Sequence, residues 1–300
     1  MNMQQDLLQN LKEIYQVDDF EIENLKSQVL ANISATKVEN SPPKCIIIAG
    51  QVGSFKEALN QTIRDELSEN VIHLSLDELR EYHPKANQIR LQTPELFLPM
   101  TQDLALILFQ HLENFSLEKG LNVILNSSLN DFDKVSEKLK TFQDKNYQTE
   151  LLMVSINKMY SYLNAEERYE ESLLKQRQPI LVSKQYHDQI YENIPTVFQQ
   201  LLSTGKLDKV KIYRLDTTPE GNTLQLLTDS KNTAVSQYLD ERSRDFNEIE
   251  TQVLQQKTRK IRDLKVSREV NFLEKIRFEA NMRVFLDDKK QKAKSSKKKM

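Results

Sequence analysis

The chain has 300 residues and a formal net charge of −2, so it is long enough for one large or two smaller domains and has no overall attraction to nucleic acid or membrane. Its single cysteine, Cys45, lies in an apolar run, which excludes a disulfide framework or a cysteine-rich metal site. The N-terminus lacks the basic start and apolar core of a signal peptide, and no apolar run approaches the roughly 20 residues that cross a bilayer. We therefore expect a cytoplasmic protein.

Residues 1–40 are predicted to form helices. Apolar residues recur at helical spacing between Leu7 and Ile14, and a second apolar stripe begins at Phe20. Two prolines, beginning with Pro42, then end any helix, because proline lacks an amide proton and restricts the residue before it. The first segment of the chain is therefore expected to consist of N-terminal helices.

Residues 41–231 alternate between short apolar runs and helical patterns. The runs are continuous and rich in β-branched residues, as in strands that are buried on both faces, and they cover residues 45–49, 71–76, 121–125, 151–156 and 210–215. Helical patterns lie between them, including residues 101–115 and 133–144. Strands that alternate with helices predict an α/β fold, a parallel sheet with helices on both faces.

The pattern changes after about residue 232. Between residues 235 and 286 there is neither proline nor glycine, and apolar residues follow helical spacings in shifted registers. Residues 232–288 are therefore predicted to be a C-terminal extension of one or two long helices. These either pack on their own domain or make a coiled-coil contact with another subunit. Residues 289–300, which are rich in lysine and serine, are predicted to be a disordered basic tail.

A phosphate-binding motif follows the first predicted strand. Residues 50–57 read Gly-Gln-Val-Gly-Ser-Phe-Lys-Glu, and a phosphate loop has the form G-x-x-x-x-G-K-[ST] between a strand and a helix. Gly50 and Lys56 match this form. The backbone amides of Gly53 and Ser54, together with the helix N-terminus, would hold phosphate. The alternative interpretation is an ordinary tight turn between a strand and a helix.

Two positions of the loop depart from the motif. Phe55 stands at the final glycine, where the backbone wraps closely around phosphate oxygens. Glu57 occupies the position at which the motif has the serine or threonine whose hydroxyl binds Mg²⁺. A carboxylate would therefore lie beside anionic phosphates. At ~4 Å and an effective dielectric constant of about 20, such a repulsion is on the order of 4 kcal/mol. Phosphate binding is expected to survive these changes better than catalysis.

Five short segments, in the same order, resemble the zeta-toxin (PezT-like) kinases over roughly residues 44–215. The loop resembles the family's G-Q-P-G-S-G-K-S, and residues 77–84, Asp-Glu-Leu-Arg-Glu-Tyr-His-Pro, resemble its D-x-x-[KR]-x-x-H-P. The other matches are residues 161–163 with 167–170, residues 184–188 with 193–195, and residues 204–205 with 212–213. The resemblance implies a kinase fold of the P-loop NTPase type.

The resemblance also implies an activity, the transfer of a nucleotide γ-phosphoryl group to a hydroxyl of UDP-N-acetylglucosamine, with ATP or GTP and Mg²⁺ as cofactors. Under this resemblance Lys56 neutralises the β- and γ-phosphates, Asp77 orients the acceptor hydroxyl, and Arg168 stabilises charge on the transferred group. Asn126 and Ser128 lie where the family binds its substrate. The family has an acidic residue at the position of Asn126.

Other roles remain open for two of these residues. Asp77 would otherwise be the N-cap of a helix, and Arg168 would otherwise form a surface ion pair with Glu166 or Glu171. A second family arginine is expected shortly before residue 184, where the aligned position is Ile180.

The lost glycine, hydroxyl, acid and arginine predict a catalytically impaired pseudokinase, because such groups act as a unit. This protein would bind a partner, antitoxin-like or a subunit of an assembly, through its N-terminal or C-terminal helices. The alternatives are an active phosphotransferase on a nucleotide sugar and a structural subunit of a larger bacterial assembly. No metal site is predicted from His83 and His187, and His73 is interpreted as a packed core residue. Nucleic-acid binding is not expected, because basic and aromatic residues do not interleave on any predicted strand.

Overall fold

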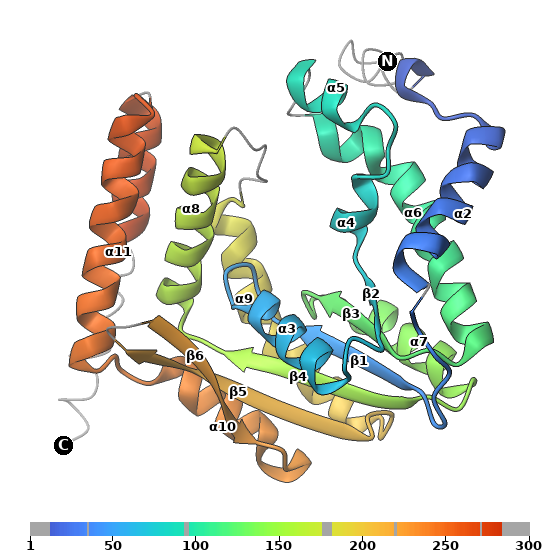
Figure 1. The fold of residues 1–300 in the computed structure, drawn as a ribbon. Coiled ribbons are helices and arrows are strands. Elements are labelled where there is room, and N and C mark those ends of the chain that lie inside the picture. The colour runs from blue at the N-terminus through green and yellow to red at the C-terminus, as the bar shows by residue number, and fades with distance from the viewer. Residues whose placement is uncertain are drawn as a thin grey trace.

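The computed structural model describes residues 13–34, 36–92, 96–175, 182–218, 221–270 and 272–283. Within these residues the strands form one sheet in the order β2-β3-β1-β4-β5-β6 (Figure 1). The strands are β1 (Lys44–Ala49), β2 (Ile72–Leu74), β3 (Val123–Ser127), β4 (Gln148–Ser155), β5 (Lys209–Thr218) and β6 (Gly221–Thr228). The first five strands are parallel to one another, which confirms the predicted α/β fold.

The sixth strand was not predicted, and it makes the sheet mixed. β6 pairs antiparallel with β5 at the edge of the sheet. Its residues are exposed or half-buried along its whole length. It therefore lacks the continuous apolar run that identifies a strand buried on both faces.

Helices cover both faces of the sheet. Successive side chains of each strand point to opposite faces, so each face contributes side chains to the packing with its own helices. Ile47 and Ala49 of β1 contribute to the larger core, formed with helices that include α6 (Phe97–Lys119), α7 (Phe132–Gln143) and α9 (Lys184–Ser203). Ile46 and Ile48 point to the opposite face, where α3 (Lys56–Glu66) packs. The alternation of side chains along β1 thus buries both faces of the strand that leads into the predicted phosphate loop.

The helical segments before the sheet lie at one end of the molecule (Figure 1). α2 (Asp19–Ser34) confirms a predicted N-terminal helix and packs on α6, while residues 1–12 lie outside the described residues. Two short helices, α4 (Leu76–Arg80) and α5 (Ala86–Gln92), follow β2.

The described part of the C-terminal extension contains three helical segments, more than the one or two that its sequence predicted. They are α10 (Lys231–Ser243), α11 (Glu248–Ser267) and residues 272–283. α10 packs against the sheet and contributes Tyr238 to the larger core. α11 runs beside α8 (Lys158–Leu174) of the same chain, as Figure 1 shows. The described extension therefore packs on its own chain, and the predicted tail, 289–300, lies outside the described residues.

Ion pairs join α11 to α8 along their length. Lys257 pairs with Glu167, and Lys265 pairs with Glu170. Lys260 pairs with both Glu167 and Glu171.

Of the helices that the structure describes, none combines the length and the apolar character that crossing a bilayer requires.

Candidate functional site

The predicted phosphate loop connects β1 to α3, as its motif requires, at the carboxyl edge of the parallel strands. The amide of Gly50 donates to the carbonyl of Ser127 on β3 at 3.2 Å, which fixes the start of the turn. Gly53 has a φ of 79°, and a Cβ there would lie 2.0 Å from the carbonyl oxygen of Ser161 on α8. The side chain of Asn164 also donates to the carbonyl of Gly53 at 2.9 Å. Only glycine fits between the loop and α8.

Phe55 adopts the backbone conformation that the motif normally gives to glycine. Its φ of 63° and ψ of 27° are left-handed, and it precedes α3 without a side-chain cap. Its ring packs edge-on against Tyr160 of α8, with 6.2 Å between the ring centroids. The benzyl group is thus held by the cluster between α8 and α11. The left-handed backbone of a non-glycine residue costs about 1–2 kcal/mol.

Lys56 turns back onto the loop that precedes it. Its Nζ donates to the carbonyls of Gly50 at 2.7 Å and Gln51 at 3.0 Å. Burial lowers the pKa of Lys56 to about 8; the carboxylate of Glu57 opposes this shift and the charge of Arg168 adds to it. The ammonium group is therefore within the turn, where a phosphate would meet it.

The loop also contains buried polar atoms without a hydrogen-bond partner in the described residues. They are the side-chain amide of Gln51 and the hydroxyl of Ser54. Buried polar groups of this kind are normally satisfied by protein, water or ligand. The donor set of Lys56, Ser54 and the α3 N-terminus suits a phosphate group.

Arg168 lies beside the loop and pairs with Glu57. Its Nη1 donates to the Glu57 carboxylate at 2.8 Å, and both side chains are more than half exposed. Arg168 therefore forms the surface ion pair that was the alternative interpretation, but the predicted partners were wrong. Glu166 pairs with Lys265, and Glu171 pairs with Lys260. The residue at the Mg²⁺ hydroxyl position therefore contacts the predicted catalytic arginine.

Asp77 is exposed at the carboxyl end of β2. Its side chain is 80% exposed and pairs with Arg80 at 3.5 Å. The alternative role as an N-cap is wrong, because Ser75 caps α4 by accepting from the amide of Glu78. β3 separates β2 from β1, so Asp77 follows a strand about 10 Å from the one that carries the loop. Within the described residues no hydrogen bond or ion pair joins Asp77 to Lys56 or Arg168.

His73 links the ends of β2 and β3, and its side chain is only 11% exposed, as its interpretation as a packed residue expects. Its Nδ1 lies 2.8 Å from the Glu78 carboxylate and its Nε2 lies 3.0 Å from the Asn126 amide. One neutral tautomer satisfies both bonds, with Nδ1 donating and Nε2 accepting. The predicted substrate residue Asn126 is thus fixed by His73, while Ser128 donates to Asn130.

The other two motif histidines have structural contacts. His83 Nε2 donates to the carbonyl of Tyr15, and its Nδ1 accepts from the amide of Lys85. His187 lies between the Ser161 hydroxyl, at 2.9 Å, and Asp188, at 3.2 Å. His187 and Ser161 are fully buried, so this arrangement holds α8 against α9 and is closed to a substrate. Among the described residues no three metal-binding side chains are grouped to hold an ion.

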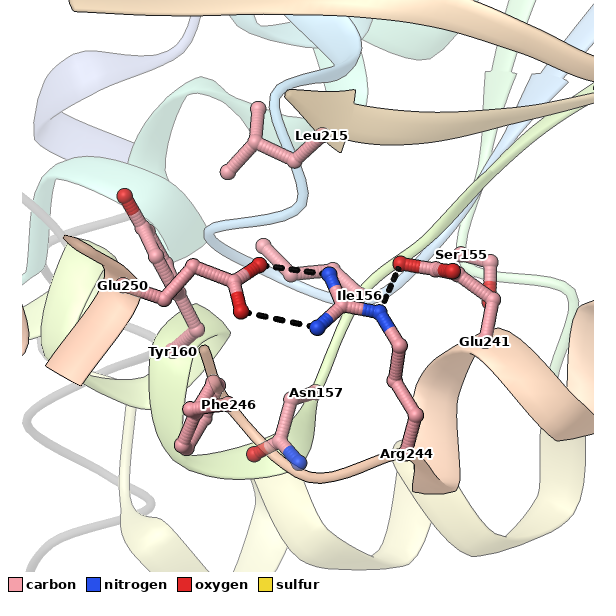
Figure 2. A pocket seen from close by; sticks show the side chains of 9 residues that line it. All are labelled: Ser155, Ile156, Asn157, Tyr160, Leu215, Glu241, Arg244, Phe246 and Glu250. Carbon is pink, nitrogen blue, oxygen red and sulfur yellow. Dashed lines mark hydrogen bonds and ion pairs between the residues drawn. The ribbon is translucent and has the colours of Figure 1, made fainter. Parts of the chain in front are cut away.

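A small cavity lies where β4 and β5 meet the C-terminal helices. Figure 2 shows Arg244 reaching from the end of α10 to the carboxylates of Glu250 and Glu241. Glu250 also forms a capping box with Asn247 at the start of α11. The cavity has room for about one water molecule. The residues that line this cavity connect the start of α11 to the end of α10 and to the sheet.

Comparison with known proteins identifies the family of the chain. The family model described as Zeta toxin matches residues 28–239, which is more than half of the chain. The chain belongs to the zeta toxin family. The family match ends within α10, so α11 and residues 272–283 lie beyond it.

Individual zeta toxins are distant in sequence. A protein named Toxin zeta from Streptococcus pyogenes is 25% identical over 197 residues, covering 65% of this chain and 68% of that protein. Toxin zeta from Enterococcus hirae is 26% identical over 193 residues, covering 64% and 67%. A chain solved in the characterization of the PezAT chromosomal toxin-antitoxin system of Streptococcus pneumoniae shares 19% identity with a TM-score of 0.71. That match covers 84% of this chain and 98% of the solved one, and it shows the same fold.

Two features of this zeta toxin family site were missed by sequence reasoning. The contact between Glu57 and Arg168 joins residues 111 positions apart, and no local pattern marks it. The bond between His73 and Asn126 joins two strands that had both been predicted. Adjacent carboxyl ends of parallel strands were the signal that could have found the second.

Proposed function

We propose that this zeta toxin family protein binds ATP or GTP at its phosphate loop, is impaired in phosphoryl transfer and acts through a protein partner. The observation that carries the proposal is the loop itself. Lys56 lies within the turn, whereas Phe55 and Glu57 replace the glycine and the hydroxyl that phosphoryl transfer needs.

The residues of the loop fit a phosphate better than they fit a Mg²⁺ ion. Gly50, Gly53, Ser54 and Lys56 supply a tight backbone turn, an unpartnered hydroxyl and a cation. The hydroxyl ligand that Mg²⁺ takes from a phosphate loop is absent, and Glu57 in its place is paired with Arg168. Nucleotide binding is thus retained in this proposal, and metal-assisted transfer is weakened.

The acceptor side of the site supports impairment as well. An amide, Asn126, stands where the family has an acid, and it is engaged by His73. Asp77 is exposed and would still be able to orient an acceptor hydroxyl such as that of a nucleotide sugar. Losing several cooperating groups reduces turnover far more than losing one.

Two surfaces suit a protein partner. The C-terminal helices expose Phe272 and Leu273 to about three-quarters of their area, and the N-terminal region exposes Phe20 similarly. Neighbouring exposed apolar side chains such as Phe272 and Leu273 are a feature of interaction sites. The PezAT structure comes from a toxin-antitoxin system, and an antitoxin-like partner is the kind we propose here.

Calorimetric titration with ATP and Mg²⁺ tests the proposal. We expect saturable binding to the wild type that Lys56→Ala weakens at least tenfold, because a charge-assisted contact is lost. Binding that is absent from the wild type, or equal in both proteins, would contradict a nucleotide site at this loop.

A second candidate function is an active phosphotransferase on a nucleotide sugar. It is favoured by one observation, the position of Lys56 and Arg168 on the same edge of the sheet, beside one loop. Slowed growth on expression, reversed by Lys56→Ala, would support this candidate over the impaired one.

A further inference from the structure

Glu57 lies where an anion is most stabilised at this site. It is the second residue of α3, within the first turn, where backbone amides and the helix dipole favour negative charge. Its carboxylate accepts from Arg168 at 2.8 Å. Partial burial raises the pKa of this carboxyl, but its own backbone amide, Arg168 and Lys56 outweigh burial, so its pKa lies below the ordinary value.

The same groups are those that a bound phosphate would use. A guanidinium beside a helix N-terminus, with a lysine nearby, is a binding arrangement for phosphate oxygens. The chain therefore carries a carboxylate in contact with the arginine that a phosphate requires.

We propose that the Glu57 carboxylate is a tethered competitor of phosphate for Arg168, so that the empty site inhibits itself. The inference rests on the proposed function, since it concerns the same loop. A phosphate ester binds by displacing Glu57 from Arg168. The affinity of the site is then set by this exchange as well as by the loop.

Two structural details make Glu57 the specific competitor. The groove beside the loop is also lined by Glu167 and Glu171, but these pair with Lys257 and Lys260 of α11. Glu57 is the carboxylate that contacts Arg168. Because the Glu57 and Arg168 side chains are 70% and 56% exposed, their ion pair is weak enough to open when a ligand arrives.

Removing the carboxylate tests the inference. Glu57→Gln keeps the length of the side chain and removes its charge, and Glu57→Ser restores the hydroxyl of the motif. We expect each variant of the full chain to bind inorganic phosphate and ATP about three- to fivefold more tightly than the wild type, which is the range that an exposed ion pair contributes. Glu171→Gln is the matched control, because it removes a carboxylate from the same groove without freeing Arg168, and its affinity should stay within about twofold.

A double-mutant cycle identifies the arginine as the group that is released. Arg168→Gln should weaken ATP binding little in the wild type, where Glu57 already neutralises it, and should abolish the gain in the Glu57→Gln protein. Equal effects of Arg168→Gln in both backgrounds would overturn the inference.

The inference and the proposed function fail in different ways. If the wild type binds ATP and Glu57→Gln binds ATP and phosphate no more tightly, the competitor is wrong and the nucleotide site stands. If Glu57→Gln gains phosphate binding through Arg168 while no variant binds ATP, the competitor stands and the nucleotide site is wrong.

Discussion

Lys265 of α11 forms an ion pair with Glu170 of α8, and both side chains are almost completely buried, at 3% and 0% exposure. Arg268 donates to the same carboxylate. Because this ion pair is buried, the C-terminal extension is held on α8 by contacts inside the protein as well as by ion pairs at its surface. Since α8 also contacts Gly53, the extension is connected to the phosphate loop through one helix.

Replacing Lys265 with methionine should destabilise the protein by about 2 kcal/mol, because buried Glu166 and Glu170 would lose a charged partner while Arg268 still donates to Glu170. Lys260→Met is the control. Lys260 is half exposed in its pairs with Glu167 and Glu171, so its loss should cost no more than about 1 kcal/mol. Chemical denaturation measures both values, and equal losses would mean that burial does not strengthen the contribution of this network.

Gly53→Ala should disrupt the loop, because the new Cβ would lie 2.0 Å from the carbonyl oxygen of Ser161. Gly205→Ala is a matched control. Gly205 has a similar φ of 69°, and no atom lies within 4 Å of the added Cβ. Both variants incur left-handed strain of about 1 kcal/mol, so the additional loss of stability in Gly53→Ala measures the clash. Equal shifts in the thermal midpoint would show that α8 does not press on the loop.

Phe55 provides a test of the backbone conformation at the last motif position. Phe55→Gly removes both the left-handed strain and the ring packed on Tyr160, whereas Phe55→Ala removes only the packing. The glycine variant should therefore be more stable than the alanine variant by about 1 kcal/mol. In most exposed or extended positions alanine is the more stable of the two. An alanine variant of greater stability would contradict the left-handed assignment.

The pH dependence of nucleotide binding follows from the pKa of Lys56. In the empty protein burial lowers this pKa to about 8, so the ammonium form is fully present only below that pH. A bound phosphate favours the ammonium form and raises the pKa again. ATP binding should therefore weaken as pH rises above about 8, with proton uptake. Titration in buffers of different ionisation enthalpy measures that uptake, and an affinity that is constant from pH 7 to pH 10 would contradict it.

Much of the fold could be predicted because it depends on local patterns. The apolar run before Gly50 identified β1, and the glycine spacing with Lys56 identified the loop. β6 was missed because an exposed edge strand has no buried run to reveal it. The number of helices after residue 232 was underestimated, since α10 ends at Ser243 and the next helix starts from the Asn247 cap without any proline or glycine between them.

The site was less predictable, because its contacts join distant parts of the chain. The loop motif located Lys56, but the partner of Arg168 depended on where α8 lies relative to the start of α3. The ion pairs between α8 and α11 were not predicted, and in the structure α11 buries part of the charged face of α8. The role of Asp77 stays a prediction, and the position of Ile180 lies outside the described residues.

The most direct test of impaired phosphoryl transfer is the turnover of ATP with Mg²⁺ in the presence of UDP-N-acetylglucosamine. We predict that the wild-type protein releases no more product than Lys56→Ala, although it binds the nucleotide. Sustained turnover by the wild type that Lys56→Ala abolishes would contradict the account and identify an active kinase.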